Sequence, residues 1–520
     1  MLAFATTLVA SLAYIEFKPK YTKNKILIPL YDYCGLIGNT PILSLASLSH
    51  LVTNSIANNR SSRGAAAPFV KVEILAKLEY NNPSRTCKDR VALGMVSSAL
   101  ARISVSSPPS KVTIVEGSSG STGISLASII KTMQKSTPFE LSFTCVCPSD
   151  MSSQKKEMID RLGGGVVSVE PASISSEQHY VNTARRLADE INNNGDLSHL
   201  AIFINQFENQ DNPNVHYTTT GPEIITQLER ADVKLDAFVV GAGTGGTITG
   251  CGRALKEHYC HHVEVVLADP QASVLCNKVR HGIAYVDEVS EQLVRRHRVD
   301  TIVEGIGLER VCGVFSSGLE VVDSAEIVTD QEVIFMAGGL LETEGVFVGG
   351  STSVNFVASV RVAKRLALEK LRAGKGGTVT VLTTICDGGE RHLSRMWNRE
   401  FVKTSLNAPP GSSASANFTP GGGGNTSGPS SNKKNPSPAP TSKKANVGTG
   451  SGSSSATPGG GGGLTKHQIT SRDCMSPTVS RSNRAAAQKA NKRIDNIVFD
   501  TERVTSSPPS TKNKICRGSG

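Results

Sequence analysis

A glycine-rich segment from Val239 to Gly250 has the composition of an anion-binding turn. It follows an apolar stretch and leads into a helix-like stretch that contains Arg253. Glycines let backbone N–H groups approach an anion, and the dipole of the following helix adds partial positive charge. The segment therefore predicts a phosphate site, and the hydroxyls of Thr244 and Thr247 favour a phosphate monoester.

The same segment is also compatible with dinucleotide binding. Gly241, Gly243 and Gly246 fit the GxGxxG pattern, and Asp269 ends the next apolar stretch 23 residues after Gly246. A dinucleotide fold places its ribose-binding acid at about that distance. An NAD-binding unit is therefore an alternative on this segment alone.

A second turn of the same kind runs from Glu116 to Ile124 and is rich in hydroxyls. It again lies between an apolar stretch and a helix-like stretch, where backbone N–H groups can bind an anion. An ordinary strand-to-helix turn with an N-cap serine is the alternative. Beside a phosphate site, a second anion site suits a carboxylate.

Lys88 lies between a loop and the start of a helix, and Asp89 and Arg90 follow it. Most lysines are solvated. Near a phosphate site, however, Lys88 becomes a candidate for a Schiff base, because a desolvated amine loses its charge and becomes nucleophilic.

Short apolar runs that alternate with helix-like stretches must position these residues. One helix is expected from Asp89, with Val91, Met95 and Ala99 on one face. Alternation of this kind predicts an α/β fold with parallel-rich sheets covered by helices. The stretch 50–68 has the composition of a surface insertion. The expected strands are Val72–Leu78, Val112–Val115, Leu141–Val146, Ala201–Ile204, Ala237–Val240, Val263–Ala268 and Val379–Ile385.

The net charge of +10 comes from the C-terminal part of the chain. Residues 404–520 contain 15 Lys and Arg against 4 Asp and Glu, so the remaining body is almost neutral. A neutral body favours a small-molecule enzyme over nucleic-acid binding. The glycine runs between Ser, Pro and Asn predict that 404–520 is a disordered basic tail.

Eleven cysteines are scattered along the chain and no CxxC occurs. This pattern favours free thiols over a disulfide framework or a zinc site, so we expect no metal.

The first 15 residues carry no charge and are mostly apolar, and four lysines follow between Lys18 and Lys25. A helix of this length spans about 22 Å, less than the ~30 Å hydrocarbon core. We expect 1–25 to be a membrane anchor, similar to those of the mitochondrial outer membrane, with the body in the cytosol. A buried segment of a cytoplasmic protein is the alternative.

The ordered motifs of the body resemble the cysteine synthase and cystathionine β-synthase family, which are fold-type II pyridoxal-phosphate enzymes. The resemblance runs from Ile37 to about Leu393, and its ending resembles a fungal cysteine-synthase-like branch. The motifs are Ile37-Gly38-Asn39-Thr40-Pro41, Pro83 to Arg90, Ser118 to Gly123, Gln206-Phe207-Glu208-Asn209, His216 to Glu223, Gly243 to Thr247, Glu304-Gly305-Ile306-Gly307, Glu344-Gly345, Gly349 to Thr352, Cys386 to Leu393 and Trp397.

The resemblance implies pyridoxal 5′-phosphate as cofactor and a role for each motif. Lys88 would hold the cofactor as a Schiff base and later move the α-proton of the substrate. The cofactor phosphate would be held by Gly243, Thr244, Gly245, Gly246 and Thr247. The amino-acid substrate would be bound by Ser118, Ser119, Gly120, Thr122, Gln206 and Gly305.

Two positions depart from the family pattern. Ser121 stands where the family usually has an asparagine that contacts the cofactor 3′-oxygen. Gly388 stands at or next to the serine that usually contacts the pyridine nitrogen, and glycine has no side chain for this. Asp387, a water molecule or no partner at all are the alternatives for that nitrogen.

The implied reaction is β-replacement, in which O-acetylserine and sulfide give cysteine and acetate. Cystathionine synthesis and serine or threonine deamination are alternatives within the family, and a membrane-tethered scaffold with little turnover is an alternative of another class. A homodimer is expected. The predicted domains are a catalytic body at 26–403, with a mobile substrate-loop subdomain at about 113–185 and a phosphate-binding domain at about 200–395, between the anchor and the tail.

Overall fold

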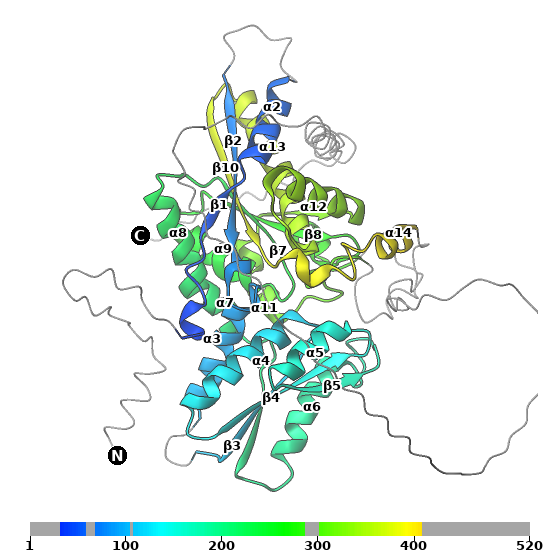
Figure 1. The fold of residues 1–520 in the computed structure, drawn as a ribbon. Coiled ribbons are helices and arrows are strands. Elements are labelled where there is room, and N and C mark those ends of the chain that lie inside the picture. The colour runs from blue at the N-terminus through cyan, green and yellow to red at the C-terminus, as the bar shows by residue number, and fades with distance from the viewer. Residues whose placement is uncertain (1–31, 59–67, 104–107, 286–300, 408–520) are drawn as a thin grey trace, which may run out of the picture. The chain divides into compact units, whose positions relative to one another are not determined.

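The computed structural model describes residues 32–58, 68–103, 108–285 and 301–407. Within these residues the chain forms two β-sheets, each covered by helices on both faces (Figure 1). The predicted α/β fold is therefore confirmed.

The first sheet has six strands in the order β1-β2-β10-β7-β8-β9, and only β1 pairs antiparallel. Its strands are β1 (Ile42–Ser44), β2 (Val70–Leu78), β7 (Ala237–Gly241), β8 (Glu264–Pro270), β9 (Ser324–Val328) and β10 (Gly377–Ile385). The second sheet has four parallel strands in the order β5-β4-β3-β6. These are β3 (Lys111–Gly117), β4 (Glu140–Pro148), β5 (Gly165–Val169) and β6 (His199–Phe203).

The helices connect these strands, as the parallel order requires. They are α2 (Ala46–Asn58), α3 (Lys88–Ala101), α4 (Ser121–Met133), α5 (Ser153–Arg161), α6 (Tyr180–Asn192), α7 (Asp211–Val215), α8 (Gly221–Arg230), α9 (Gly246–His258), α10 (Leu275–His281), α11 (Gly313–Ser316), α12 (Asp330–Glu344), α13 (Gly350–Arg372) and α14 (Arg399–Asn407). Short helical turns lie at Cys34–Leu36, Glu79–Asn81, Gln134–Ser136, His216–Thr220, Leu319–Val321 and Gly389–His392.

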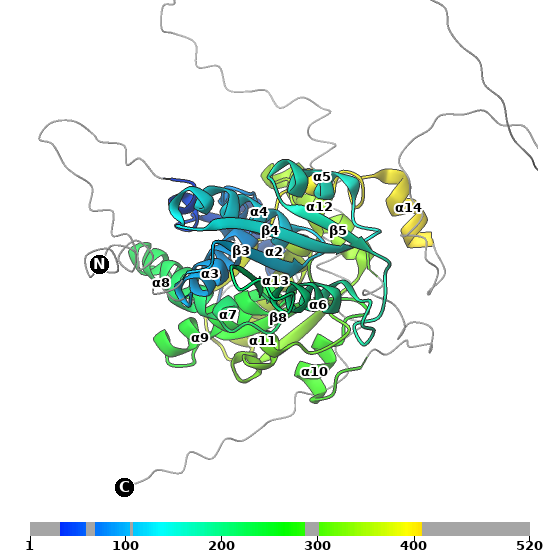
Figure 2. The same ribbon diagram turned by 90° about the horizontal axis from the view of Figure 1, so that it is seen from below.

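Apolar side chains from both faces of each sheet form the core. On the six-stranded sheet, α2, α12 and α13 pack on one face, while α8, α9 and α10 pack on the other. On the four-stranded sheet, α3, α4 and α5 cover one face and α6 covers the other (Figure 2). Strands buried on both faces carry near-continuous apolar runs, which is why they stood out in the sequence.

All seven predicted strands are present, with bounds that differ by a few residues. The surface insertion predicted at 50–68 is wrong for its first part, because 50–58 belongs to α2 and Val52 and Ile56 are buried in the core. Polar residues of α2 are also buried against the sheet, among them Ser49 and Thr53. The hydroxyls of Ser49 and Thr53 accept hydrogen bonds from the N–H groups of Ile74 and Val72, at 2.9 and 3.0 Å.

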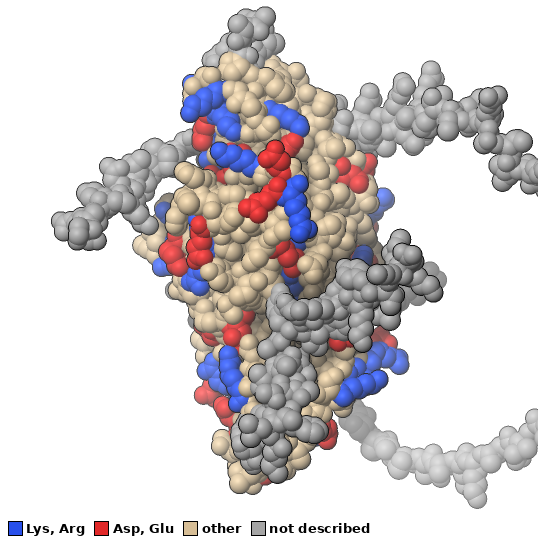
Figure 3. Space-filling model, turned by 90° about the vertical axis from the view of Figure 1, so that its left-hand side faces the viewer, with Lys and Arg blue, Asp and Glu red and all other residues tan. Residues whose placement is uncertain are grey.

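Some predictions concern residues outside the described ranges. The anchor at 1–25 and most of the tail at 404–520 lie there. The predicted start of the tail is wrong, because 404–407 belong to α14. Among the described residues, the structure has no helix of the length and apolarity that a bilayer crossing requires. On the described surface, Lys and Arg are interspersed with Asp and Glu on the face drawn in Figure 3. The predicted subdomain boundaries and mobility stay predictions.

Candidate active site

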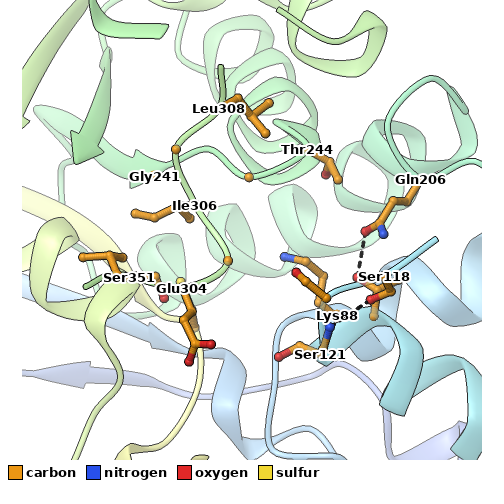
Figure 4. Close-up of a pocket in the computed structure, with 18 of the residues that line it drawn as sticks. Lys88, Ser118, Ser121, Gln206, Gly241, Thr244, Glu304, Ile306, Leu308 and Ser351 are labelled. Carbon is orange, nitrogen blue, oxygen red and sulfur yellow. Dashed lines mark hydrogen bonds between the residues drawn. The ribbon is translucent and has the colours of Figure 1, made fainter. Parts of the chain in front are cut away.

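A cavity of about 250 Å³ lies where the carboxyl ends of strands from both sheets come together. Lys88, the turn before α4 and the turn before α9 all line it (Figure 4). Ligands of parallel sheets bind at this edge, because the following helices point their N-termini toward it. The fold thus brings together the three segments that the sequence singled out.

The turn before α9 is a tight loop that only glycine allows. Gly245 has a φ of 89°. A Cβ on Gly243 would lie 2.2 Å from the carbonyl oxygen of Gly305, and one on Gly246 would lie 1.9 Å from Oδ1 of Asn212. Asn212 donates from Nδ2 to the Thr244 hydroxyl at 2.9 Å and so orients it. The loop therefore presents backbone N–H groups and an oriented hydroxyl at the start of a 13-residue helix.

His216 supports the second threonine of this turn. Its Nε2 lies 3.3 Å from Oγ1 of Thr247, and its Nδ1 lies 2.9 Å from the Thr220 hydroxyl. Burial lowers the pKa of His216 to about 3, so the imidazole is neutral. A neutral ring can hold the Thr247 hydroxyl without adding charge to the site.

The turn before α4 is held by its own side chains. The Ser118 hydroxyl accepts hydrogen bonds from the N–H groups of Gly120 and Gly123, at 3.2 and 3.1 Å. Thr122 donates to Oε1 of Gln206 at 2.7 Å, and Nε2 of Gln206 donates to the carbonyl of Gly117 at 3.1 Å. Gln206, which follows β6, thus fixes the shape of a turn that is 84 residues away in the sequence.

Lys88 is the first residue of α3 and is half-buried. Its Nζ donates to Sγ of Cys87 at 3.6 Å. The Cys87 thiolate raises the pKa of Lys88, and Cys386 and Asp387 add to this effect against burial. Burial favours the neutral amine, but these anionic neighbours favour the charged form and outweigh it.

Cys87 was not singled out in the sequence, because one cysteine among eleven carries no signal. A hydrogen bond with the Cys386 thiol, together with the charge of Lys88, lowers the pKa of Cys87 to about 7. The backbone brings the two cysteines together, since the N–H of Cys87 donates to the carbonyl of Cys386 at 2.8 Å.

The structure brings almost every predicted site residue to the cavity. The residues that line it are Lys88, Ser118, Ser119, Gly120, Ser121, Thr122, Gln206, Gly243, Thr244, Gly245, Gly246, Thr247 and Gly305. Gly388 does not line the cavity, whereas Asp387 does. Gly388 is turned away because its backbone forms a bridge with Val348, and a Cβ there would lie 2.0 Å from the Glu390 carboxylate.

Ser121 has a partner of its own. Nη1 of Arg391 lies 3.4 Å from its hydroxyl, and the guanidinium of Arg391 also donates to the carbonyl of Ser84. A cation beside Ser121 can compensate for the shorter reach of serine.

Asp269, the acid of the dinucleotide alternative, is fully buried. Its Oδ2 accepts a hydrogen bond from the N–H of Cys276 at 2.8 Å, at the start of α10. It does not line the cavity, so it cannot bind a ribose there.

Comparisons with known proteins agree with this geometry. A model of the pyridoxal-phosphate dependent enzyme family matches residues 34–385. A Saccharomyces cerevisiae protein named "Putative mitochondrial cysteine synthase" is 37% identical over 398 residues, which are 76% of this chain and 91% of that protein. "Cysteine synthase 2" of Neurospora crassa is 41% identical over 367 residues, which are 70% of this chain and 72% of that protein.

Solved structures show the same fold. An O-acetylserine dependent cystathionine β-synthase from Helicobacter pylori aligns with a TM-score of 0.51 and 27% identity, over 71% of this chain and 98% of that one. An O-ureido-L-serine synthase aligns with a TM-score of 0.52 and 24% identity, over 70% and 94%.

The fold, the cavity and the family match define a pyridoxal-phosphate-dependent enzyme. With fungal relatives at 37% and 41% identity over most of its body, the chain belongs to the cysteine synthase family. The recognition made from the sequence motifs, including the fungal branch, is thereby confirmed.

The residues present fit pyridoxal phosphate. The cavity is lined by a lysine amine and by the α9 turn, whose glycines pack so closely against Gly305 and Asn212 that no Cβ fits. Oδ1 of Asp387, which lines the cavity, is buried and makes no hydrogen bond within the described residues. Such groups are costly to bury without partners, so the site is built for a polar occupant.

We predict that Gly243→Ala weakens the affinity for pyridoxal phosphate by about 10-fold or more. The added Cβ pushes against the Gly305 carbonyl and must displace one of the two loops, and a local distortion of 1–3 kcal/mol corresponds to that change. Titration of the cofactor-free protein, followed by fluorescence, measures it. Gly165→Ala in β5 is the control, because its Cβ meets Thr144 at an ordinary 3.5 Å. Equal affinities of the two variants would contradict the prediction.

Proposed function

We propose that this enzyme catalyses β-replacement on an activated serine such as O-acetylserine, with sulfide as second substrate, and releases cysteine and acetate. The observation that carries the proposal is that two helix N-termini, those of α4 and α9, face Lys88 in one cavity. One N-terminus suits the phosphate of the cofactor and the other suits the carboxylate of an amino acid.

Lys88 is the covalent attachment point for the cofactor and the base that takes the α-proton of the substrate. In the free protein its amine is charged, because Cys87, Cys386 and Asp387 raise its pKa. The Cys87 thiolate, 3.6 Å from Nζ, is placed to accept the proton that Lys88 must lose. The same pair can return a proton to Lys88 between steps.

The turn before α9 binds the cofactor phosphate through its N–H groups and through Thr244 and Thr247. Asn212 and His216 keep these two hydroxyls in place. When bound, pyridoxal phosphate supplies an electron sink that makes the α-proton of the amino acid acidic and lets the β-substituent leave.

The turn before α4 binds the substrate carboxylate. Its N–H groups and the Thr122 hydroxyl lie at the start of the helix, and Gln206 holds them to β3. Movement of this turn over a bound amino acid excludes water and protects reactive intermediates from hydrolysis. Gly305, on the opposite loop of the cavity, leaves room for the amino acid, since no heavy atom lies within 4 Å of its Cβ position.

The test is product identification with the full chain loaded with pyridoxal phosphate. O-acetylserine with sulfide, serine with homocysteine, and threonine alone are offered in separate assays, and the products are identified by mass. Cysteine as the main product supports the proposal. Cystathionine or an oxoacid as the main product would replace it with a sibling activity, and a loaded protein without any turnover would favour the scaffold.

We predict that Thr122→Val raises the KM for the amino-acid substrate by about 10-fold with a smaller effect on kcat. The substitution leaves Oε1 of Gln206 without its 2.7 Å donor and so loosens the turn that binds the carboxylate, and a loss of this kind is worth about 1–2 kcal/mol. Steady-state kinetics measure the change. Thr132→Val is the matched control, because it removes a hydroxyl that donates to Ser128 in the same helix, away from the cavity. A KM change of the same size in the control would refute the assigned role.

The assembly and location of the enzyme are further parts of the proposal. We propose a homodimer, which light scattering of the full chain tests by its mass. We also propose residence at mitochondria, at the cytosolic side of the outer membrane through residues 1–15. Imaging of the full chain beside a chain that begins at residue 26 tests this, and identical cytosolic distributions would argue against it.

A further inference from the structure

Two carboxylates and the imidazole between them form a hydrogen-bonded chain along one wall of the cavity. Nδ1 of His392 lies 3.2 Å from Oε2 of Glu304, and Nε2 of His392 lies 3.0 Å from Oδ2 of Asp387. All three line the same cavity as Lys88, and Figure 4 shows Glu304 on the side of the cavity away from Gln206. Asp387 is 8% exposed and His392 is 4% exposed.

The backbone places Asp387 next to the catalytic segment. Asp387 follows β10 and forms an antiparallel bridge with Thr86, two residues before Lys88. Gly349 leaves the space that the carboxylate needs, since a Cβ there would lie 2.2 Å from Oδ1 of Asp387. The carboxylate is thus held by a strand end on one side and by the start of α13 on the other.

The charges along the chain keep Asp387 ionised. Glu304 is paired with Lys155 at 3.1 Å and with Arg395 at 3.5 Å. The two carboxylates that flank His392 overcome its burial and raise its pKa to about 9. The resulting imidazolium, against the effect of burial, holds the pKa of Asp387 below its usual range.

One oxygen of this ionised carboxylate has no donor. Oδ1 of Asp387 is buried and makes no hydrogen bond among the described residues, while Oδ2 is taken by His392. Leaving a charged acceptor without a donor costs more than leaving a neutral one without a donor. A bound group that brings a proton would remove this cost.

Only one polar group of pyridoxal phosphate can bring that proton. The aldehyde reacts with an amine, and the phosphate and the ring oxygen are anions that a carboxylate repels. The ring nitrogen, when protonated, is a cationic donor. Lys88 and the α9 turn serve the aldehyde and the phosphate in the proposed function, which leaves the nitrogen for this wall.

We propose that Asp387 accepts a hydrogen bond from the ring nitrogen of pyridoxal phosphate and keeps that nitrogen protonated, with His392 and Glu304 as positioning residues. The inference rests on the proposed use of the cofactor in this cavity and assigns a carboxylate where glycine at 388 has no side chain. A protonated ring draws electrons more strongly than a neutral one. The charge of Asp387 therefore makes the α-proton of the substrate more acidic.

The test reads the ring nitrogen directly. The full chain is reconstituted with pyridoxal phosphate that carries ¹⁵N in the ring, and the nitrogen chemical shift is recorded by solid-state NMR. The expected shift in the wild type is that of a protonated pyridine. In Asp387→Ser and Asp387→Asn the expected shift is that of a neutral pyridine. A neutral nitrogen in the wild type, or a protonated one in either variant, would overturn the proposal.

A control variant and a second readout separate this proposal from the proposed function. Asp150→Asn removes another carboxylate that lines the cavity, and it should leave the nitrogen shift unchanged. Turnover of O-acetylserine and sulfide is measured on the same samples. A protonated nitrogen without cysteine formation would contradict only the β-replacement assignment. Cysteine formation with a neutral nitrogen would contradict only the role of Asp387.

Discussion

Lys88→Ala is expected to lower kcat for cysteine formation by at least about 10³-fold. The variant has no amine to bond to the cofactor and no base at the α-carbon, and general-base catalysis alone contributes about 10²–10⁴-fold. Both losses fall on one atom, Nζ of Lys88, because the second lysine that lines the cavity, Lys155, is paired with Glu304 at 3.1 Å. Steady-state kinetics on protein saturated with pyridoxal phosphate measure the effect.

A covalent readout distinguishes this loss from poor folding. Borohydride reduction followed by peptide mass mapping should find the cofactor on the peptide that contains Lys88 in the wild type, and on no peptide in Lys88→Ala. Lys71→Ala is the control, because this side chain is 58% exposed in β2 and pairs with Glu73 on the same strand. Cofactor attachment in Lys88→Ala, or near-normal turnover, would refute the assignment of Lys88.

The parts of this site that lie close together in the sequence could be predicted, because local spacing determines them. The α9 turn needs glycines at fixed intervals for the Gly305 loop and Asn212 to pack against it. The α4 turn needs Ser118 two and five residues before the N–H groups that it caps. Such constraints leave a pattern that can be read without a structure.

Contacts between distant segments leave no such pattern. Asp387, His392 and Glu304 come from two segments more than 80 residues apart, and each alone is an ordinary polar residue. Their charges, like the thiolate of Cys87, acquire their effect only from neighbours that the fold supplies. For this reason the partner of the ring nitrogen could not be chosen from the sequence, and Gly388 was assigned to the site.

Three strands of the structure, β1, β5 and β9, were not predicted from the sequence. β5 and β9 lie at the edges of their sheets and are only partly buried, and β1 has three residues. Such strands carry shorter apolar runs than central parallel strands. β6 is also an edge strand, but it was found because its residues 200–203 are all apolar. Helix α2 was not predicted because its buried face contains the polar residues Ser49 and Thr53. Their hydroxyls accept hydrogen bonds from backbone N–H groups of β2.

A buried network of charged side chains joins α3 to the end of β2 and to α8. Arg90, two residues after Lys88, donates to Glu79 at 2.7 and 2.9 Å and to Glu223 at 2.7 Å. Glu79 is fully buried, and Lys77, also fully buried, donates to Glu223 at 2.9 Å. The start of α3, and with it Lys88, is thereby tied to the end of β2 and to α8.

Arg90→Met is expected to lower the free energy of unfolding by about 3–5 kcal/mol, because it leaves the Glu79 carboxylate buried without its cation. Urea denaturation of the full chain measures the loss. Arg102→Met, at the C-cap of the same helix, is the matched control. Its side chain is 66% exposed and pairs with Asp211, so the expected loss is below about 1 kcal/mol. Equal losses in the two variants would refute the role of the buried network.

The acid response of the two proteins gives a second check on the same network. Despite its burial, Arg90 and Lys77 hold the pKa of Glu223 at about 2, below its ordinary value of 4.5. A lowered pKa contributes stability that is fully present above pH 4.5 and is lost as the pH falls toward 2. The stability of the wild type should therefore fall more steeply than that of Arg90→Met over this interval. Parallel pH profiles would mean that Glu223 does not depend on Arg90, and the ties between α3, β2 and α8 would then have to rest on apolar packing instead.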